Sequence, residues 1–361
     1  EFTPEGSRSR WLLRNTGEGR FEDATQASGL FTDRSGNAGA LAGDVIVAGD
    51  VNNDGYTDIF IAASSGDGTV SSELRLGKGD GTFEFAAETS EARLAGQVSV
   101  PSGLSLTDAD RDGSLDLWMT QNKTGSQQSP MADRFFFGDG AGGFRDASAN
   151  VGLATLAWQN ARVEQLNAAE GNSWSWGANA CDLDGNGVPE LLSPAYGRSP
   201  NHLWLGAEVG SSVEFSNHSV ASGYAYDAIE DWSDNESARC WCKLNPGDAG
   251  CDGMPQPRIN CSQNSDAFRW RHSTDREPWR LGGNSGGTIC GDVDNDGRLD
   301  LLTSEIVHWD VGRNSDESEL LFNTGETPLR FERPGNDATG LARRKPAGSW
   351  DEGIITVNLL D

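Results

Sequence analysis

The sequence predicts an all-β protein built from repeated four-stranded sheets, and two recurring motifs carry this prediction. The first is a nine-residue acidic loop that occurs four times, each time directly before an apolar, strand-like run. The second is a hairpin with a Gly/Asp/Asn turn that closes on phenylalanine and follows each loop. Self-similarity of this kind is typical of repeat architectures, in which each repeat is one supersecondary unit.

The acidic loop has the same layout in all four copies. "DVNNDGYTD" begins at Asp50, "DADRDGSLD" at Asp108, "DLDGNGVPE" at Asp182 and "DVDNDGRLD" at Asp292. Oxygen-bearing side chains occupy positions 1, 3 and 5, glycine occupies position 6, and a carboxylate occupies position 9. Calcium takes six to eight oxygen ligands, and glycine adopts the sharp turn at little cost. The layout therefore predicts a calcium loop.

The predicted ligands are the side-chain oxygens at positions 1, 3, 5 and 9 and the backbone carbonyl at position 7. They are Asp50, Asn52, Asp54, Tyr56, Asp58, Asp108, Asp110, Asp112, Ser114, Asp116, Asp182, Asp184, Asn186, Val188, Glu190, Asp292, Asp294, Asp296, Arg298 and Asp300. We expect about four calcium ions, one per loop. Magnesium is the alternative ion, and a metal-free Asp/Asn/Gly turn is the structural alternative. The third loop differs from the others because it has Asn at position 5 and the longer Glu at position 9.

The segments around the loops indicate strands rather than helices. EF-hand loops open with the same pattern but end on Glu at position 12 and lie between helices. Here "VIVAGD" and "TDIFIAA" flank the first loop. The later hairpins close at Phe83, Phe144, Phe215 and Phe331, so each repeat contains four antiparallel strands. Four strands per repeat, at loop spacings of 58 and 74 residues, are typical of β-propeller blades.

Both ends of the chain fall in mid-repeat. "RWLLRNTGEGRF" predicts a hairpin whose loop would lie before residue 1, and "SWDEGIITVNLLD" predicts a first strand that stops at Asp361. We expect residues 1–361 to form one β-propeller with about five blades' worth of sequence. The complete propeller would have as many as seven blades, or the two ends would combine into one closing blade.

Charge and hydropathy exclude two classes of function. The chain has 55 acidic against 28 basic residues and a formal net charge of -27, so it lacks the basic face that nucleic-acid binding requires. No stretch reaches the roughly 18 to 20 apolar residues that a membrane span needs. The acidity serves solubility, cation binding or both.

Six cysteines indicate disulfides more than a zinc site, and with them an oxidising compartment. Four of them, Cys240, Cys242, Cys251 and Cys261, lie in an insertion at residues 222–283 that shows no helical or strand period. We expect a disulfide-stapled loop without a core of its own. Cys181 and Cys290 precede their loops by different numbers of residues, so we do not expect them to pair with each other. A disulfide between Cys181 or Cys290 and a cysteine of the insertion would link the insertion across blades.

Aromatic residues suggest a working surface near the insertion. Its tryptophans, with Trp174, Trp176, His308 and Trp309, would form a sugar-binding or protein-binding surface, and ordinary packing is the alternative. The insertion tryptophans are Trp232, Trp241, Trp270 and Trp279. His202 and His218 flank a blade hairpin and are interpreted as structural, and His272 and His308 lie in no pattern typical of a general base or metal ligand, so no catalytic residue is assigned. Were the chain an enzyme, the carboxylates to consider would be Asp44, Asp351 and Glu352.

The loops, together with the hairpin "LGKGDGTF", resemble FG-GAP/VCBS-type repeats, which build the β-propeller of integrin α subunits and of many secreted bacterial proteins. The resemblance covers most of the chain outside the insertion. It implies that loop positions 1, 3, 5, 7 and 9 bind calcium, that the protein is extracellular, and that catalysis is usually absent. The Phe-Gly and Gly-Ala-Pro motifs for which the family is named are absent, and "LLSPAYG" at 191–197 resembles them only weakly. The chain is therefore nearer the bacterial branch.

The expected function is a calcium-binding, non-catalytic β-propeller with a role in adhesion, ligand binding or structural assembly. The partner would be a protein or glycan ligand on a cell surface or in an extracellular assembly. The expected location is secreted or at the cell surface, with the periplasm as a further compartment. The alternative is a secreted polysaccharide lyase or glycoside hydrolase on the same scaffold, because a fold does not fix a function.

Overall fold

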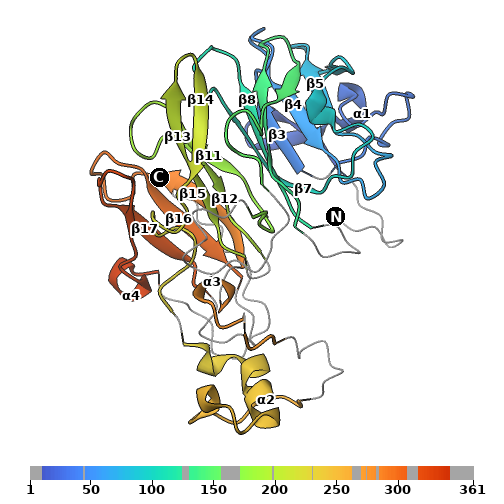
Figure 1. The fold of residues 1–361 in the computed structure, drawn as a ribbon. Coiled ribbons are helices and arrows are strands. Elements are labelled where there is room, and N and C mark those ends of the chain that lie inside the picture. Colours follow the sequence, from blue (N-terminus) through green and yellow to red (C-terminus); the bar gives the residue numbers. More distant parts are fainter. Residues whose placement is uncertain are drawn as a thin grey trace.

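The computed structural model describes residues 10–43, 45–123, 130–155, 171–196, 199–229, 231–261, 270–273, 275–281, 284–306 and 316–341. These residues form four four-stranded antiparallel sheets and one two-stranded hairpin (Figure 1). The hairpin pairs β1 (Leu13–Gly17) with β2 (Arg20–Asp23), as the motif that ends at Phe21 predicts. Among the described residues, no helix is long and apolar enough to cross a membrane.

Each sheet is one repeat, and we refer to the sheets as blades 1 to 4. Blade 1 has β3 (Val45–Gly49), β4 (Asp58–Ala62), β5 (Glu73–Gly77) and β6 (Phe83–Phe85); blade 2 has β7 (Pro101–Thr107), β8 (Asp116–Gln121), β9 (Arg134–Gly138) and β10 (Phe144–Asp146); blade 3 has β11 (Asn179–Cys181), β12 (Glu190–Ser193), β13 (His202–Val209) and β14 (Ser212–Asn217); blade 4 has β15 (Ser285–Gly291), β16 (Asp300–Glu305), β17 (Glu319–Asn323) and β18 (Phe331–Glu332). The helices are short: α1 (Thr25–Ser28), α2 (Glu236–Leu244), α3 (Pro278–Leu281) and α4 (Asn336–Thr339).

Successive blades meet along their first strands. β3 contacts β7, β7 contacts β11, and β11 contacts β15. Each sheet has its strands in sequence order, so the fourth strand is the outer edge. This is the arrangement of propeller blades around a common axis, and it confirms the predicted fold class.

The hydrophobic core lies between blades. On β8, Leu117 and Met119 pack with blade 1, whereas Trp118 packs with blade 3. This follows from the strand period of two, which sends successive side chains to opposite faces. All six residues of β8 are buried, as expected of a strand covered on both faces.

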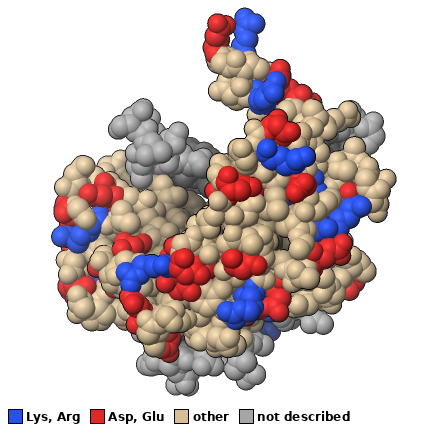
Figure 2. Space-filling view, turned by 90° about the horizontal axis from the view of Figure 1, so that it is seen from above, with Lys and Arg blue, Asp and Glu red and all other residues tan. Residues whose placement is uncertain are grey.

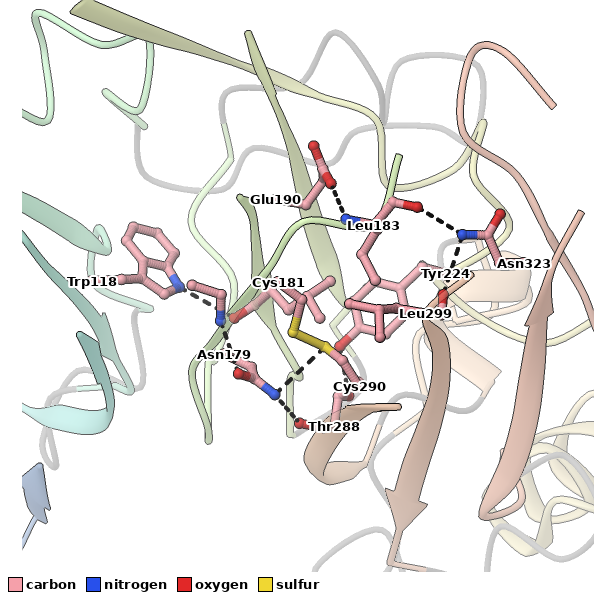
Figure 3. The surroundings of a disulfide bond; sticks show 12 residues. Trp118, Asn179, Cys181, Leu183, Glu190, Tyr224, Thr288, Cys290, Leu299 and Asn323 are labelled. Atoms are coloured by element: carbon pink, nitrogen blue, oxygen red, sulfur yellow. Dashed lines mark hydrogen bonds between the residues drawn. A yellow bond between two sulfur atoms is a disulfide. The ribbon is translucent and has the colours of Figure 1, made fainter. Parts of the chain in front are cut away.

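The structure corrects the prediction for Cys181 and Cys290, which form a disulfide with each other (Figure 3). In blade 3, Cys181 lies opposite the position 9 residue of its loop, Glu190. In blade 4, the residue opposite position 9 is Gly291, which follows Cys290. A shift of one residue turns a side chain to the other face of its sheet. Blades 3 and 4 pack face to face, so two cysteines that meet between them must come from opposite faces. The register difference is therefore what allows this pair.

The insertion holds its own two disulfides, Cys240–Cys261 and Cys242–Cys251, and is linked by neither of them to a blade. Its stapled character is confirmed, but the expectation that it lacks a core is wrong. Ala238 on α2, Trp270 and Leu281 are buried together, with Trp232 and Trp241 packed against them. Disulfide closure and a few large side chains thus suffice for a small satellite core.

Candidate metal centres in the four loops

The four acidic loops all connect the first and second strands of a blade. Loop 1 (residues 50–58) joins β3 to β4, loop 2 (108–116) joins β7 to β8, loop 3 (182–190) joins β11 to β12, and loop 4 (292–300) joins β15 to β16. The strand that follows begins at position 9 in every case. The loops therefore lie at one end of the blades within β-hairpins, as the flanking sequence predicts.

Hydrogen bonds from the backbone to the acidic side chains shape each loop in the same way. In loop 2, Asp108 Oδ2 accepts from Gly113 N at 3.0 Å and Asp112 Oδ1 accepts from Ser114 N at 2.7 Å. The corresponding bonds recur in the other three loops. The glycine at position 6 has φ between 85° and 89°, which explains why glycine occurs there each time.

Position 4 is a second left-handed position that the sequence analysis missed. Asn53, Arg111 and Asn295 have φ of 57°, 60° and 61°, and Gly185 has φ of 75°. Asn and Gly tolerate this conformation, whereas Arg does so at a cost. The Asn/Gly preference at position 4 was the sequence signal for this turn.

The carboxylate at position 9 is buried and joins two parts of its blade. Asp116 Oδ2 accepts from Ala109 N at 2.9 Å, and its Oδ1 accepts from Gly138 N, at the end of β9, at 3.0 Å. Asp58, Glu190 and Asp300 make the same pair of bonds in their own blades. These carboxylates are 0 to 1% exposed. Position 9 therefore fastens the loop to the third strand in addition to any role as a metal ligand.

Three loops bring carboxylates from positions 1, 3 and 9 together. Each group has ligand atoms that all lie within 4.8 Å of one another. The groups are Asp108, Asp110 and Asp116; Asp182, Asp184 and Glu190; and Asp292, Asp294 and Asp300. Loop 1 has Asn52 at position 3, so this position offers an amide oxygen in place of a carboxylate. These groups can hold a metal ion.

Two observations test whether the loops fit a cation. Asp108 Oδ1 and Asp182 Oδ1 are buried and have no hydrogen-bond partner, although nearly all buried polar atoms in proteins have one. Burial, followed by the nearby acidic side chains, raises the pKa of Asp116 to about 7 and that of Glu190 to about 8. The unpartnered oxygens lack a positive or hydrogen-bonding partner, and the raised pKa values mean that burial disfavours the charged form of the carboxylates; a hard cation beside them would satisfy the oxygens and stabilise the charged form.

The structure does not bring every predicted ligand into these groups. Asp112 and Asp296, at position 5, lie outside them, and in loop 1 Asp54 Oδ2 accepts from Asn52 Nδ2 at 2.9 Å. The position 7 residues, Tyr56, Ser114, Val188 and Arg298, donate their N–H to position 5. Their carbonyls, and the position 5 oxygens, remain predicted ligands.

Substitution of Asp116 by Asn should destabilise the protein even without metal. The amide nitrogen of Asn would face one of the two backbone N–H groups that now donate to Asp116, leaving it unpaired. We expect a loss of about 1–3 kcal/mol in the free energy of unfolding, measured by urea titration in excess chelator. Asp112→Asn is the matched control, because Asp112 is exposed and Asn keeps its acceptor oxygen. Equal losses in the two variants would contradict this role of position 9.

The other residues singled out in the sequence divide into three sets. His202 is buried and its pKa is lowered to about 4 by burial, and His272 stacks on Trp241 at 3.6 Å, so both are packing residues. Trp176 is 41% exposed and lies against Tyr196, which leaves it available for contacts. His308, Trp309, Asp44, Asp351 and Glu352 lie outside the described residues, as does the strand predicted near Asp361.

One protein family matches part of this chain. Residues 50–119 match the FG-GAP-like repeat, a span that contains loops 1 and 2 and the strands between them. No curated protein matches the chain. Among solved structures, a lectin from Agrocybe aegerita that recognises non-reducing terminal N-acetylglucosamine is similar at 12% identity, covering 84% of this chain and 68% of the lectin with a TM-score of 0.32. So low a score carries no argument about ligand.

The repeat match and the architecture agree. The matched span ends within β8, and blades 3 and 4 repeat the same loop, strand order and position 9 hydrogen bonds outside it. Residues 50–119 therefore form an FG-GAP-like repeat, and blades 3 and 4 share its layout.

Proposed function

We propose that this protein is a calcium-stabilised β-propeller, secreted or displayed at the cell surface, that binds a protein or glycan ligand in adhesion or extracellular assembly and catalyses no reaction. The observation that carries the proposal is the shared geometry of loops 1 to 4. All four place oxygen-bearing side chains at positions 1, 3, 5 and 9, loops 2 to 4 bring the carboxylates of positions 1, 3 and 9 together, and in loops 2 and 3 a buried carboxylate oxygen at position 1 has no hydrogen-bond partner.

Calcium is favoured over other cations by the chemistry of the donors. The loops offer only oxygen atoms, which excludes the nitrogen and sulfur donors that zinc and copper sites favour. Magnesium keeps several waters and suits sites with few protein ligands, whereas these loops have up to five candidate donors each. The calcium would be held by side chains at positions 1, 3 and 9, with positions 5 and 7 completing the shell.

Location is supported by the cysteines. All six are in disulfides, three pairs in total, and no cysteine is free. Disulfides persist in oxidising compartments, which favours export from the cytoplasm. The rival activity, a polysaccharide lyase or glycoside hydrolase, rests on Asp44, Asp351 and Glu352, which the structure does not describe.

Calcium binding should be stoichiometric with the loops. We expect chelator-stripped protein to bind about four calcium ions, measured by calorimetric titration and by metal analysis after dialysis. Magnesium at the same concentration should bind much more weakly, because the loops suit the larger ion. Protein that is folded by circular dichroism and binds no calcium would contradict the proposal.

A further inference from the structure

A histidine lies among the aromatic side chains of the insertion. The ring of His272 stacks on that of Trp241, with ring centres 3.6 Å apart and 3° between the planes. It meets the Trp232 ring edge-on at 5.4 Å, and Trp232 in turn stacks on Trp270 at 6.0 Å. These tryptophans pack with Ala238 of α2 in the satellite core. Because only 10% of the His272 side chain is exposed, a charge on this ring would act directly on that core.

One hydrogen bond decides which form of the ring the satellite core accepts. Trp270 Nε1 donates to His272 Nδ1 at 3.1 Å, and an indole N–H can only donate. The ring that fits is therefore the neutral imidazole, with its proton on Nε2. In the imidazolium both nitrogens carry a hydrogen. Protonation of Nδ1 would then remove this bond and set two N–H donors against each other.

In the part of the insertion that the structure describes, two charged side chains act on the ring. His272 Nε2 lies 3.5 Å from Asp248 Oδ1, and this carboxylate side chain is 40% exposed, so water screens its attraction. Arg276 donates from Nε to the backbone oxygen of His272, and its guanidinium lies over the Trp232 ring. Burial lowers the pKa of His272, the positive charge of Arg276 lowers it further, and Asp248 offsets only part of this. The surroundings therefore disfavour the charged ring.

The insertion lies at the end of the blades opposite to the acidic loops. It follows β14 and precedes β15, whose far end leads into loop 4, and α2 lies at the bottom of Figure 1. Figure 2 shows the other end, across which acidic side chains recur with basic ones beside several of them. Both disulfides of the insertion, Cys240–Cys261 and Cys242–Cys251, close within it. The satellite core can therefore open locally and close again without unfolding a blade.

We propose that His272 is an acid-sensitive switch: its protonation opens the satellite core and exposes Trp232, Trp241 and Trp270 while the blades stay folded. The folded insertion takes up this proton less readily than the unfolded chain, in which a histidine has a pKa of about 6.5. The stability of the satellite core is therefore fully present above about pH 6.5 and is lost as the pH falls below it. The aromatic surface so exposed is available for contacts in acid and withdrawn at neutral pH.

The test is amide hydrogen exchange of the full chain in excess calcium, from about pH 7.5 down to about pH 5, corrected for the intrinsic pH dependence of exchange. The protection of α2 should fall by up to about tenfold for each pH unit below about 6.5, until the folded ring itself takes the proton. The protection of β8 should not change. His272→Asn removes the titrating ring and keeps an uncharged acceptor oxygen near the place of Nδ1. In this variant the protection of α2 should be independent of pH.

His218→Asn is the matched control, because His218 lies outside the insertion with its Nε2 2.9 Å from the backbone oxygen of Leu329, and this variant should keep the acid response of α2. Protection of α2 that is unchanged down to about pH 5, or an acid response that persists in His272→Asn, would overturn the switch. Should His272→Asn already be open at neutral pH, NMR of the imidazole C–H signals in the unaltered protein decides. There His272 should titrate below about pH 6.5, and titration at or above that value would overturn the proposal.

Discussion

Removal of calcium should lower the melting temperature of the full chain by roughly 10–20 °C, and added calcium should restore it. A single site at one hundred times its dissociation constant stabilises the folded state by about 2.7 kcal/mol. Each kcal/mol corresponds to roughly 2 °C or somewhat less in a chain of this size. Several sites that are lost together therefore add up to a large shift. Differential scanning calorimetry with and without chelator measures it.

The expected size follows from what the loops contain. Fourteen of the 55 acidic residues lie at the ligand positions of the four loops. In three loops the carboxylates converge within 4.8 Å, where like charges repel and water is partly excluded. A cation converts this repulsion into attraction. Because position 9 also accepts from the backbone at the end of the third strand, loss of the cation disturbs the whole blade rather than a surface turn.

A single-loop variant separates calcium from a general effect of the chelator. Asp294→Ala removes the position 3 oxygen ligand from loop 4 altogether and leaves the other three loops intact. It should lose about a quarter of the calcium-dependent gain in melting temperature and should match the unaltered protein closely in chelator. An unchanged transition of the unaltered protein in excess chelator would rule out structural calcium.

The loops and hairpins could be predicted because their determinants are local. Nine consecutive residues fix the hydrogen bonds around Asp108, and the Gly113 turn needs no information from elsewhere in the chain. The same is true of the β1–β2 hairpin, whose turn and strands are contiguous. Patterns with a fixed register therefore identified the blade, its loop and the strand that starts at position 9.

Features that depend on neighbouring blades could not be predicted in this way. The β13–β14 hairpin of blade 3 reaches loop 2 of blade 2 through an ion pair between Arg111 and Glu208, which are 97 residues apart. The core of the insertion likewise needs Trp270 to meet α2, a contact that the local sequence "ESARCWCKL" does not specify, although its apolar residues follow a helical period. The Cys181–Cys290 disulfide is a feature of the same kind, because two cysteines in different strand registers meet only through the packing of facing sheets.

Loss of the Cys181–Cys290 disulfide should cost roughly 4–5 kcal/mol in the free energy of unfolding. The bond spans 109 residues of sequence and encloses blade 3 and the insertion. By the chain-entropy relation, a loop of that length restricts the unfolded chain by about 4.8 kcal/mol. It also joins first strands of two blades, so its loss loosens contacts between β11 and β15. The double variant Cys181→Ala/Cys290→Ala, unfolded in urea with calcium present, measures the effect.

The matched control is Cys242→Ala/Cys251→Ala, which opens a bond spanning 9 residues inside the insertion. The same relation gives about 2.6 kcal/mol for this shorter loop, and the affected residues pack with the satellite core rather than with a blade. Near-ultraviolet circular dichroism should therefore show the insertion tryptophans loosening while the main urea transition keeps its midpoint. The inter-blade variant should move that midpoint to lower urea. If neither variant moved the midpoint of the main transition, the Cys181–Cys290 disulfide would not contribute to the stability of the blades. Blades 3 and 4 would then be held together by their shared apolar core alone.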